Sequence, residues 1–193
     1  MNTSRLAFIA AALLSAGAAH ASFSGDFSAA NWATSVSNGG NGSAVVSSDG
    51  STLTLTSSDF SPFTSLLASD VSSQITLTQA VSLSFDWAYV SNDENGSSSD
   101  PFGYSVDGVF TQLSANDSWD GQSGNVTLSL NKGQTFAFVS RSVDSIFGAS
   151  VATVTGFSAT TTAPTPAVPE PSGAALVAGG LLALAAVGRR RVR

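Results

Sequence analysis

The stretch VSLSFDWAYV, residues Val81–Val90, decides the fold class of this chain. Its odd-numbered positions are the apolar residues Val81, Leu83, Phe85, Trp87 and Tyr89. The positions between them are Ser82, Ser84, Asp86 and Ala88. An apolar residue at every second position is typical of a β-strand with one buried face, because a helix repeats about every 3.6 residues. We therefore expect a strand here, with Trp87 in the core.

The same alternation recurs in shorter runs on both sides of this stretch. Further strands are expected at Thr52–Ser57, Gln74–Thr78, Asn125–Leu130, Phe136–Ser140 and Ala149–Phe157. Asp107-Gly108 indicates a two-residue hairpin, and Asn131–Gln134 is expected to join its flanking strands in the same manner. No window of residues 22–158 reads as a helix. The pattern predicts an all-β domain, an antiparallel, jelly-roll-like β-sandwich of about eight to ten strands with Phe136 in its core.

The composition of residues 22–158 restricts the classes of partner and of chemistry. This segment has twelve Asp and Glu residues against the two bases Lys132 and Arg141, a formal net charge of −10. So acidic a domain repels nucleic-acid phosphates and attracts cations. The chain has no cysteine, and its one histidine, His20, precedes the domain. Nucleophilic triads and the usual zinc sites are therefore absent, and we expect no enzyme, although a glycan-active enzyme with two carboxylates stays open as a third alternative.

An acidic loop follows the clearest strand. It reads SNDENGSSSDP, Ser91–Pro101, and its carboxylates Asp93, Glu94 and Asp100 are the side chains we expect to bind calcium. Calcium takes six to eight oxygen ligands, and a bound ion would stiffen a domain that lacks disulfides. The spacing is not that of an EF-hand, and the alternative is a solvated, flexible loop without any cofactor.

Two tryptophans lie in polar, turn-rich segments. Trp119 stands in NDSWDGQSG beside acidic and amide side chains, and Trp32 stands near the start of the domain. Either indole could stack on a sugar ring, which makes both residues candidates for carbohydrate binding. The alternative is that each closes one end of the hydrophobic core.

The N-terminal residues 1–21 have the features of a signal peptide. Arg5 precedes the apolar run Leu6–Leu14, and Ala19-His20-Ala21 fits a signal-peptidase site. We expect signal peptidase to cut after Ala21, so that the mature chain is exported through the inner membrane.

The C-terminus combines three signals in a fixed order. A Thr/Pro/Ala linker, residues 159–167, leads to the motif Val168, Pro169, Glu170 and Pro171. Residues 172–188 are uncharged and would form a helix about 26 Å long, just under the hydrocarbon core of about 30 Å. The arginines Arg189, Arg190, Arg191 and Arg193 would hold the end of this transmembrane helix in the cytoplasm. The alternative is that these residues are an ordinary membrane anchor.

The order of motif, short apolar helix and arginine cluster in residues 168–193 resembles the PEP-CTERM sorting signal of Gram-negative bacteria. The resemblance implies processing by an exosortase that recognises residues 168–171, and a role at the cell surface or in an extracellular matrix of exopolysaccharide, biofilm or floc. Residues 133–157 are similar to the closing strands of small extracellular β-sandwich domains. We therefore expect a structural or adhesive matrix protein, with a carbohydrate- or calcium-binding module as the alternative.

Overall fold

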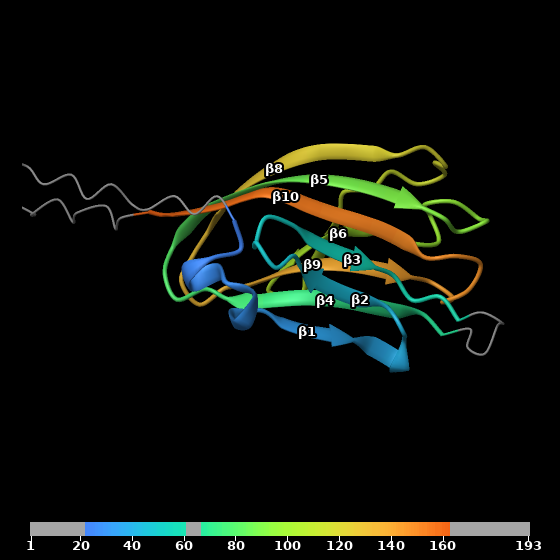
Figure 1. Cartoon of the computed structure of the whole chain (residues 1–193), viewed down its shortest axis with the longest axis horizontal. Helices are drawn as coiled ribbons and strands as arrows, with labels where there is room; N and C mark the ends of the chain where they lie inside the picture. The colour runs from blue at the N-terminus through green and yellow to red at the C-terminus, as the bar shows by residue number, and fades with distance from the viewer. Residues whose placement is uncertain (1–21, 61–66, 163–193) are drawn as a thin grey trace, which may run out of the picture. The chain divides into compact units, whose positions relative to one another are not determined.

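The computed structural model describes residues 22–60 and 67–162 (Figure 1). Within these residues the chain forms ten β-strands and three single 3-10 turns, and it forms no α-helix. The strands are β1 Ala33–Val36, β2 Ser43–Val46, β3 Leu53–Thr56, β4 Ser69–Thr76, β5 Val81–Ser91, β6 Phe102–Val106, β7 Val109–Gln112, β8 Gln122–Leu130, β9 Thr135–Ser142 and β10 Ser150–Thr161. The 3-10 turns are η1 Gly25–Phe27, η2 Ala29–Asn31 and η3 Ser37–Gly39.

The strands form two five-stranded sheets that pack face to face. One sheet has the order β1-β4-β9-β6-β7 and the other β2-β3-β10-β5-β8. Every strand pairing is antiparallel. The expected antiparallel β-sandwich is therefore confirmed for the described residues.

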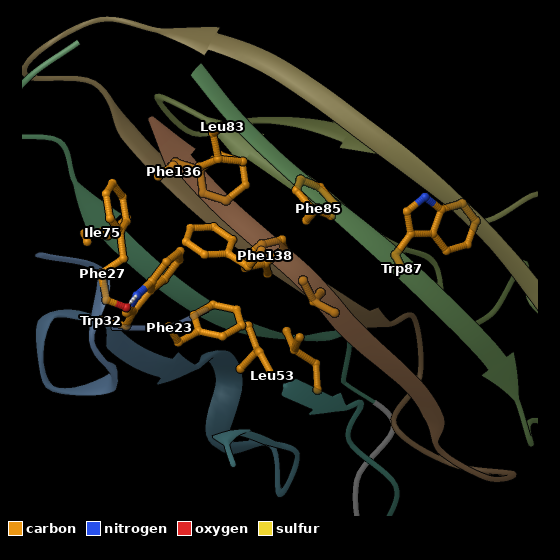
Figure 2. Close-up of a cluster of buried hydrophobic side chains, with 14 of the residues drawn as sticks. Phe23, Phe27, Trp32, Leu53, Ile75, Leu83, Phe85, Trp87, Phe136 and Phe138 are labelled. Carbon is orange, nitrogen blue, oxygen red and sulfur yellow. Dashed lines mark hydrogen bonds between the residues drawn. The ribbon is translucent and has the colours of Figure 1, made fainter. Parts of the chain in front are cut away.

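The core lies between the sheets and is built mainly of aromatic rings (Figure 2). β5 alternates between buried and more exposed residues along its whole length, as its sequence predicts. Both residues expected in the core are there, since Trp87 is 8% exposed and Phe136 is fully buried. Phe138 lies at the centre, with its ring centroid 4.9 Å from those of Phe85 and Phe136. Such edge-to-face contacts add to the burial of apolar area in stabilising the domain.

One of the two expected turns is confirmed and the other is wrong. Asp107 and Gly108 have positive φ angles of 50° and 80°, and Val106 pairs with Val109 across them, as a two-residue hairpin requires. Asn131–Gln134 does not close a hairpin, because β8 pairs with β5 in one sheet while β9 pairs with β4 and β6 in the other. That turn carries the chain from one sheet to the other and bonds to Leu77 instead.

β10 is longer than its sequence pattern suggests. Its register with β5 shifts between Thr155 and Ser158, so the inward positions change from Ala152 and Val154 to Phe157 and Ala159. The strand then continues to Thr161, which pairs with Val81. The expected linker therefore begins too early at residue 159, because Ala159 is fully buried in the sandwich.

The expected signal peptide (residues 1–21) and sorting segment (residues 168–193) lie outside the described residues. No helix in residues 22–60 and 67–162 is long and apolar enough to cross a bilayer. The expected span at residues 172–188 falls beyond this part of the chain.

Candidate functional site

Three loops meet at one end of the sandwich, on the right in Figure 1. They are the β5–β6 loop (residues 92–101), the β7–β8 loop (residues 113–121) and the β9–β10 loop (residues 143–149). The amide of Glu94 donates to the carbonyl of Phe147 at 3.0 Å, and the amide of Ser97 donates to the carbonyl of Ser118 at 3.2 Å. The β5–β6 loop is therefore bonded to both of its neighbours, and the three loops form one connected surface.

Trp119 is the most exposed aromatic residue of this loop end, with 66% of its area accessible. Its indole lies against the backbone of Gly96, since a Cβ added to that glycine would lie 3.4 Å from Cε2. The loop beneath it is fixed by Ser97, whose hydroxyl donates to the carbonyl of Ala115 at 2.6 Å and accepts from the amide of Ser118 at 3.0 Å. Trp119, one of the two candidates for carbohydrate binding, therefore presents an accessible aromatic face on a structured loop, and the alternative that it closes the core is wrong.

The loop that carries this indole and the β5–β6 loop beneath it also carry exposed polar residues. We define the Trp119 surface as Trp119 with the exposed residues Glu94, Asn95, Asn116, Asp117 and Asp120. Asn116 is held by the side-chain amide of Gln112 at 2.7 Å, and Gln122 exchanges two hydrogen bonds with the backbone of Ala115. An exposed ring on loops that also carry exposed amides and carboxylates can offer stacking and hydrogen bonding together, which is the combination that a sugar requires.

The expectation that Trp32 could bind carbohydrate is wrong. Trp32 is 8% exposed, and its indole N–H donates to the carbonyl of Phe27 at 2.9 Å. Its ring stacks on Phe138 with centroids 5.6 Å apart, as Figure 2 shows. The alternative interpretation holds for this residue, because η1 and η2 fold it into the core, where no sugar reaches it.

The three expected calcium ligands do not come together. Asp93 and Asp100 are 2% and 0% exposed, whereas Glu94 is on the surface. In the described residues no three acidic, histidine or cysteine side chains are close enough to share a metal ion. The expected set of Asp93, Glu94 and Asp100 is therefore wrong as a group, because the turn from Asp93 to Gly96 leaves Glu94 on the surface while Asp93 and Asp100 are buried. The alternative of a solvated loop is wrong as well.

Asp93 and Asp100 form instead a buried acidic pair among serines. One oxygen of Asp93, Oδ1, accepts from the amide of Asn95 at 2.5 Å. Its Oδ2 and both carboxylate oxygens of Asp100 are buried with no hydrogen-bond partner. Burial raises the pKa of Asp100 to about 7; the nearby hydroxyl of Ser142 offsets part of this, and the charge of Asp93 adds to it. Burial raises the pKa of Asp93 too.

Tyr89 connects this pair to the core. Its hydroxyl donates to the backbone carbonyl of Asp100 at 2.7 Å, and burial raises the pKa of Tyr89 to about 12. Sequence reasoning found the two aspartates but missed the serines around them, Ser57, Ser140, Ser142 and Ser150. Those serines lie on β9, on β10 and just after β3, so only the strand order brings them to the loop.

A cleft of about 460 Å³ at the opposite end of the sandwich was not expected from the sequence. Its polar lining residues, from η1, η2, β4 and the turn after β4, include Asp26, Asn31, Gln74 and Gln79. Its apolar lining residues include one aromatic ring, Phe27, which is only 4% exposed. The cleft therefore lacks the open aromatic face that Trp119 provides.

No known family model matches the chain, and no curated protein matches it. Among solved structures it is similar to the carbohydrate-binding module TmCBM61 in complex with beta-1,4-galactotriose, at 9% identity and a TM-score of 0.36, over 69% of this chain and 90% of that one. A family 35 carbohydrate-binding module from Clostridium thermocellum is similar at 11% identity and a TM-score of 0.32, over 63% and 90%. An exo-beta-1,3-galactanase from Phanerochaete chrysosporium is similar at 16% identity and a TM-score of 0.29, over 73% and 29%. Similarity at this level supports no inference about a shared ligand.

Proposed function

We propose that this chain is an exported, non-catalytic matrix protein that adheres to extracellular polysaccharide through the Trp119 surface. The observation that carries the proposal is an indole that is 66% exposed and yet seated on Gly96 by a hydrogen-bonded loop. A large exposed ring on a fixed support supports a binding role, because tryptophan is among the side chains that contribute most to binding hot spots. The amides and carboxylates around it supply partners for sugar hydroxyls.

The charge of the domain favours a neutral glycan. Its formal net charge of −10 in residues 22–158 repels acidic polysaccharides at low ionic strength. Stacking on an indole, by contrast, depends on the apolar face of a sugar ring and is insensitive to salt. We therefore expect the Trp119 surface to bind galactans, glucans and other uncharged polymers more tightly than uronic-acid polymers.

Substitution of Trp119 by Ala is expected to abolish most of this binding while leaving the fold intact. The full chain is run through native gels that contain soluble galactan, dextran, hydroxyethyl cellulose or alginate, and retardation gives the affinity. Removal of a central tryptophan costs about 2 kcal/mol or more, so the Kd for the retarding glycan should rise by about 30-fold. The melting temperature should not change, because the ring is exposed.

Trp119→Phe is the matched control and should keep much of the retardation, since it preserves an aromatic face. Tryptophan fluorescence provides a second readout, because Trp32 and Trp87 are each 8% exposed and a bound sugar can shield only Trp119. Equal retardation of the wild type and Trp119→Ala would refute the role of this surface. If no neutral glycan retards the wild type, the proposed binding function is refuted. If incubation with the protein shortens a glycan, the proposal that the protein is non-catalytic is refuted.

The proposed route to the matrix concerns residues 168–193, which resemble an exosortase substrate signal. We expect signal peptidase to remove residues 1–21, and an exosortase to process the chain near Pro169, Glu170 and Pro171 after the inner membrane has held it. Intact mass of the protein from the envelope and the medium of its host tests this route. A mass that ends near Pro171 supports sorting, whereas a mass that runs through Arg193 means that the segment is a permanent anchor.

A further inference from the structure

The buried acidic pair at the loop end has no cationic side chain to balance it. Three of the four carboxylate oxygens of Asp93 and Asp100 are enclosed and unpaired. Residues 22–158 contain two bases, of which Arg141 forms an ion pair with Asp70 at 3.1 Å and Lys132 is exposed in the β8–β9 turn. Buried carboxylates without such a partner are costly unless a cation or a proton neutralises them.

Further negative charge surrounds the pair. Asp59 and Asp144 both act electrostatically on Asp93, and Asp93 acts on Asp100. Asp144 is fixed by the amide of Ile146, which donates to its Oδ1 at 3.2 Å. Four carboxylates thus converge on one end of the sandwich from the loops after β3, β5 and β9. Such a field attracts a small cation into the interior.

Neutral oxygens complete the surroundings. The Ser57 hydroxyl oxygen accepts from the amide of Ser150 at 2.8 Å, and the Ser142 hydroxyl oxygen accepts from the amide of Ser145 at 2.9 Å. Both hydroxyls are fully or almost fully buried near the carboxylate of Asp100. Each oxygen is therefore oriented by the backbone, and it keeps its own O–H group and a second lone pair for the Asp100 carboxylate or another partner.

We propose that Asp93 and Asp100, with the serine hydroxyls beside them, bind a calcium ion inside the loop end of the sandwich. Two carboxylates with hydroxyl, carbonyl and water oxygens match the all-oxygen coordination that calcium requires, and they do not match zinc. Glu94 takes no part, because it is on the surface. The ion replaces the missing positive side chain and fixes the turn from Asp93 to Gly96, where the carbonyl of Asp93 accepts from the amide of Gly96 at 2.9 Å.

Thermal unfolding of the full chain with calcium chloride and with a chelator at pH 7.5 tests the proposal. Saturating calcium should raise the melting temperature of the wild type by about 5–10 °C relative to chelator. Asp100→Asn and Asp93→Asn should lose this shift. Glu94→Gln and Asp120→Asn are the matched controls, since both remove an exposed carboxylate of the same loop end. Both variants should keep the calcium-induced rise in melting temperature.

A second measurement does not depend on the stability of any variant. Terbium added to the wild type should luminesce when Tyr89 and Trp87 are excited, because the Tyr89 hydroxyl bonds to Asp100, and calcium should displace the signal. Coinciding melting curves in calcium and chelator would overturn the site. A calcium shift that survives in Asp93→Asn and Asp100→Asn, or that is lost in Glu94→Gln, would place the ion elsewhere.

Discussion

Phe138→Ala is expected to lower the free energy of unfolding by about 3–5 kcal/mol, a large part of the 5–15 kcal/mol that a domain of this size has in total. The ring of Phe138 is fully buried and contacts five other aromatic rings, those of Phe23, Trp32, Phe85, Phe136 and Phe157. These rings come from both sheets and from the segment before β1, so no single element can move to fill the cavity. Urea unfolding followed by circular dichroism measures the loss.

Two variants separate the cavity from a general effect of losing an aromatic residue. Phe138→Leu keeps most of the volume and should cost clearly less than the alanine variant. Trp119→Ala removes a larger ring from the surface and should change the urea midpoint little. A Phe138→Ala protein with the stability of the wild type would mean that the two sheets are not packed as described.

Gly148→Ala is expected to destabilise the domain by at least about 2 kcal/mol. Gly148 has a φ of +118°, a conformation that L side chains rarely adopt, and a Cβ at this position would lie 2.2 Å from the carbonyl oxygen of Asn92. Beside this contact, Asn92 donates two hydrogen bonds to the carbonyl of Ala149. The backbone amide of Asn92 donates at 3.3 Å and its side-chain amide at 2.9 Å. The methyl group must therefore push the β9–β10 loop away from the β5–β6 loop.

Gly133→Ala is the matched control for this variant. Gly133 also has a positive φ, +87°, but nothing lies within 4 Å of its added Cβ. That substitution should cost only the backbone strain, about 1 kcal/mol. The urea midpoint measures both, and equal losses for Gly148→Ala and Gly133→Ala would show that the two loops do not approach each other so closely.

The sequence was most informative where the chain is regular. The alternation in β5 predicted the strand, its buried face and the place of Trp87, because a strand whose one face is buried must follow a period of two. It could not give the turn at Asn131–Gln134, since two strands joined by a short turn can lie in one sheet or in two. Nor did the alternation predict the register shift in β10, where the inward positions change from even to odd residue numbers between Val154 and Phe157.

The candidate site was harder to predict, because loops have no period. Trp32 and Trp119 looked alike in sequence, yet the 3-10 turns bury the first and the β7–β8 loop exposes the second. Asp93 and Asp100 were expected to bind calcium together with Glu94, or else to lie in a solvated, flexible loop. Their burial depends on serines from distant strands, and a sequence without any pairing information does not contain that proximity.

The length of β10 sets the distance between the two ends of the domain. The strand starts at Ser150 beside the loop end and finishes at Thr161, so its twelve residues cover about 40 Å. Thr161 pairs with Val81, which lines the cleft at the opposite end of the sandwich. A polymer bound on the Trp119 surface would therefore leave that cleft accessible to a second ligand.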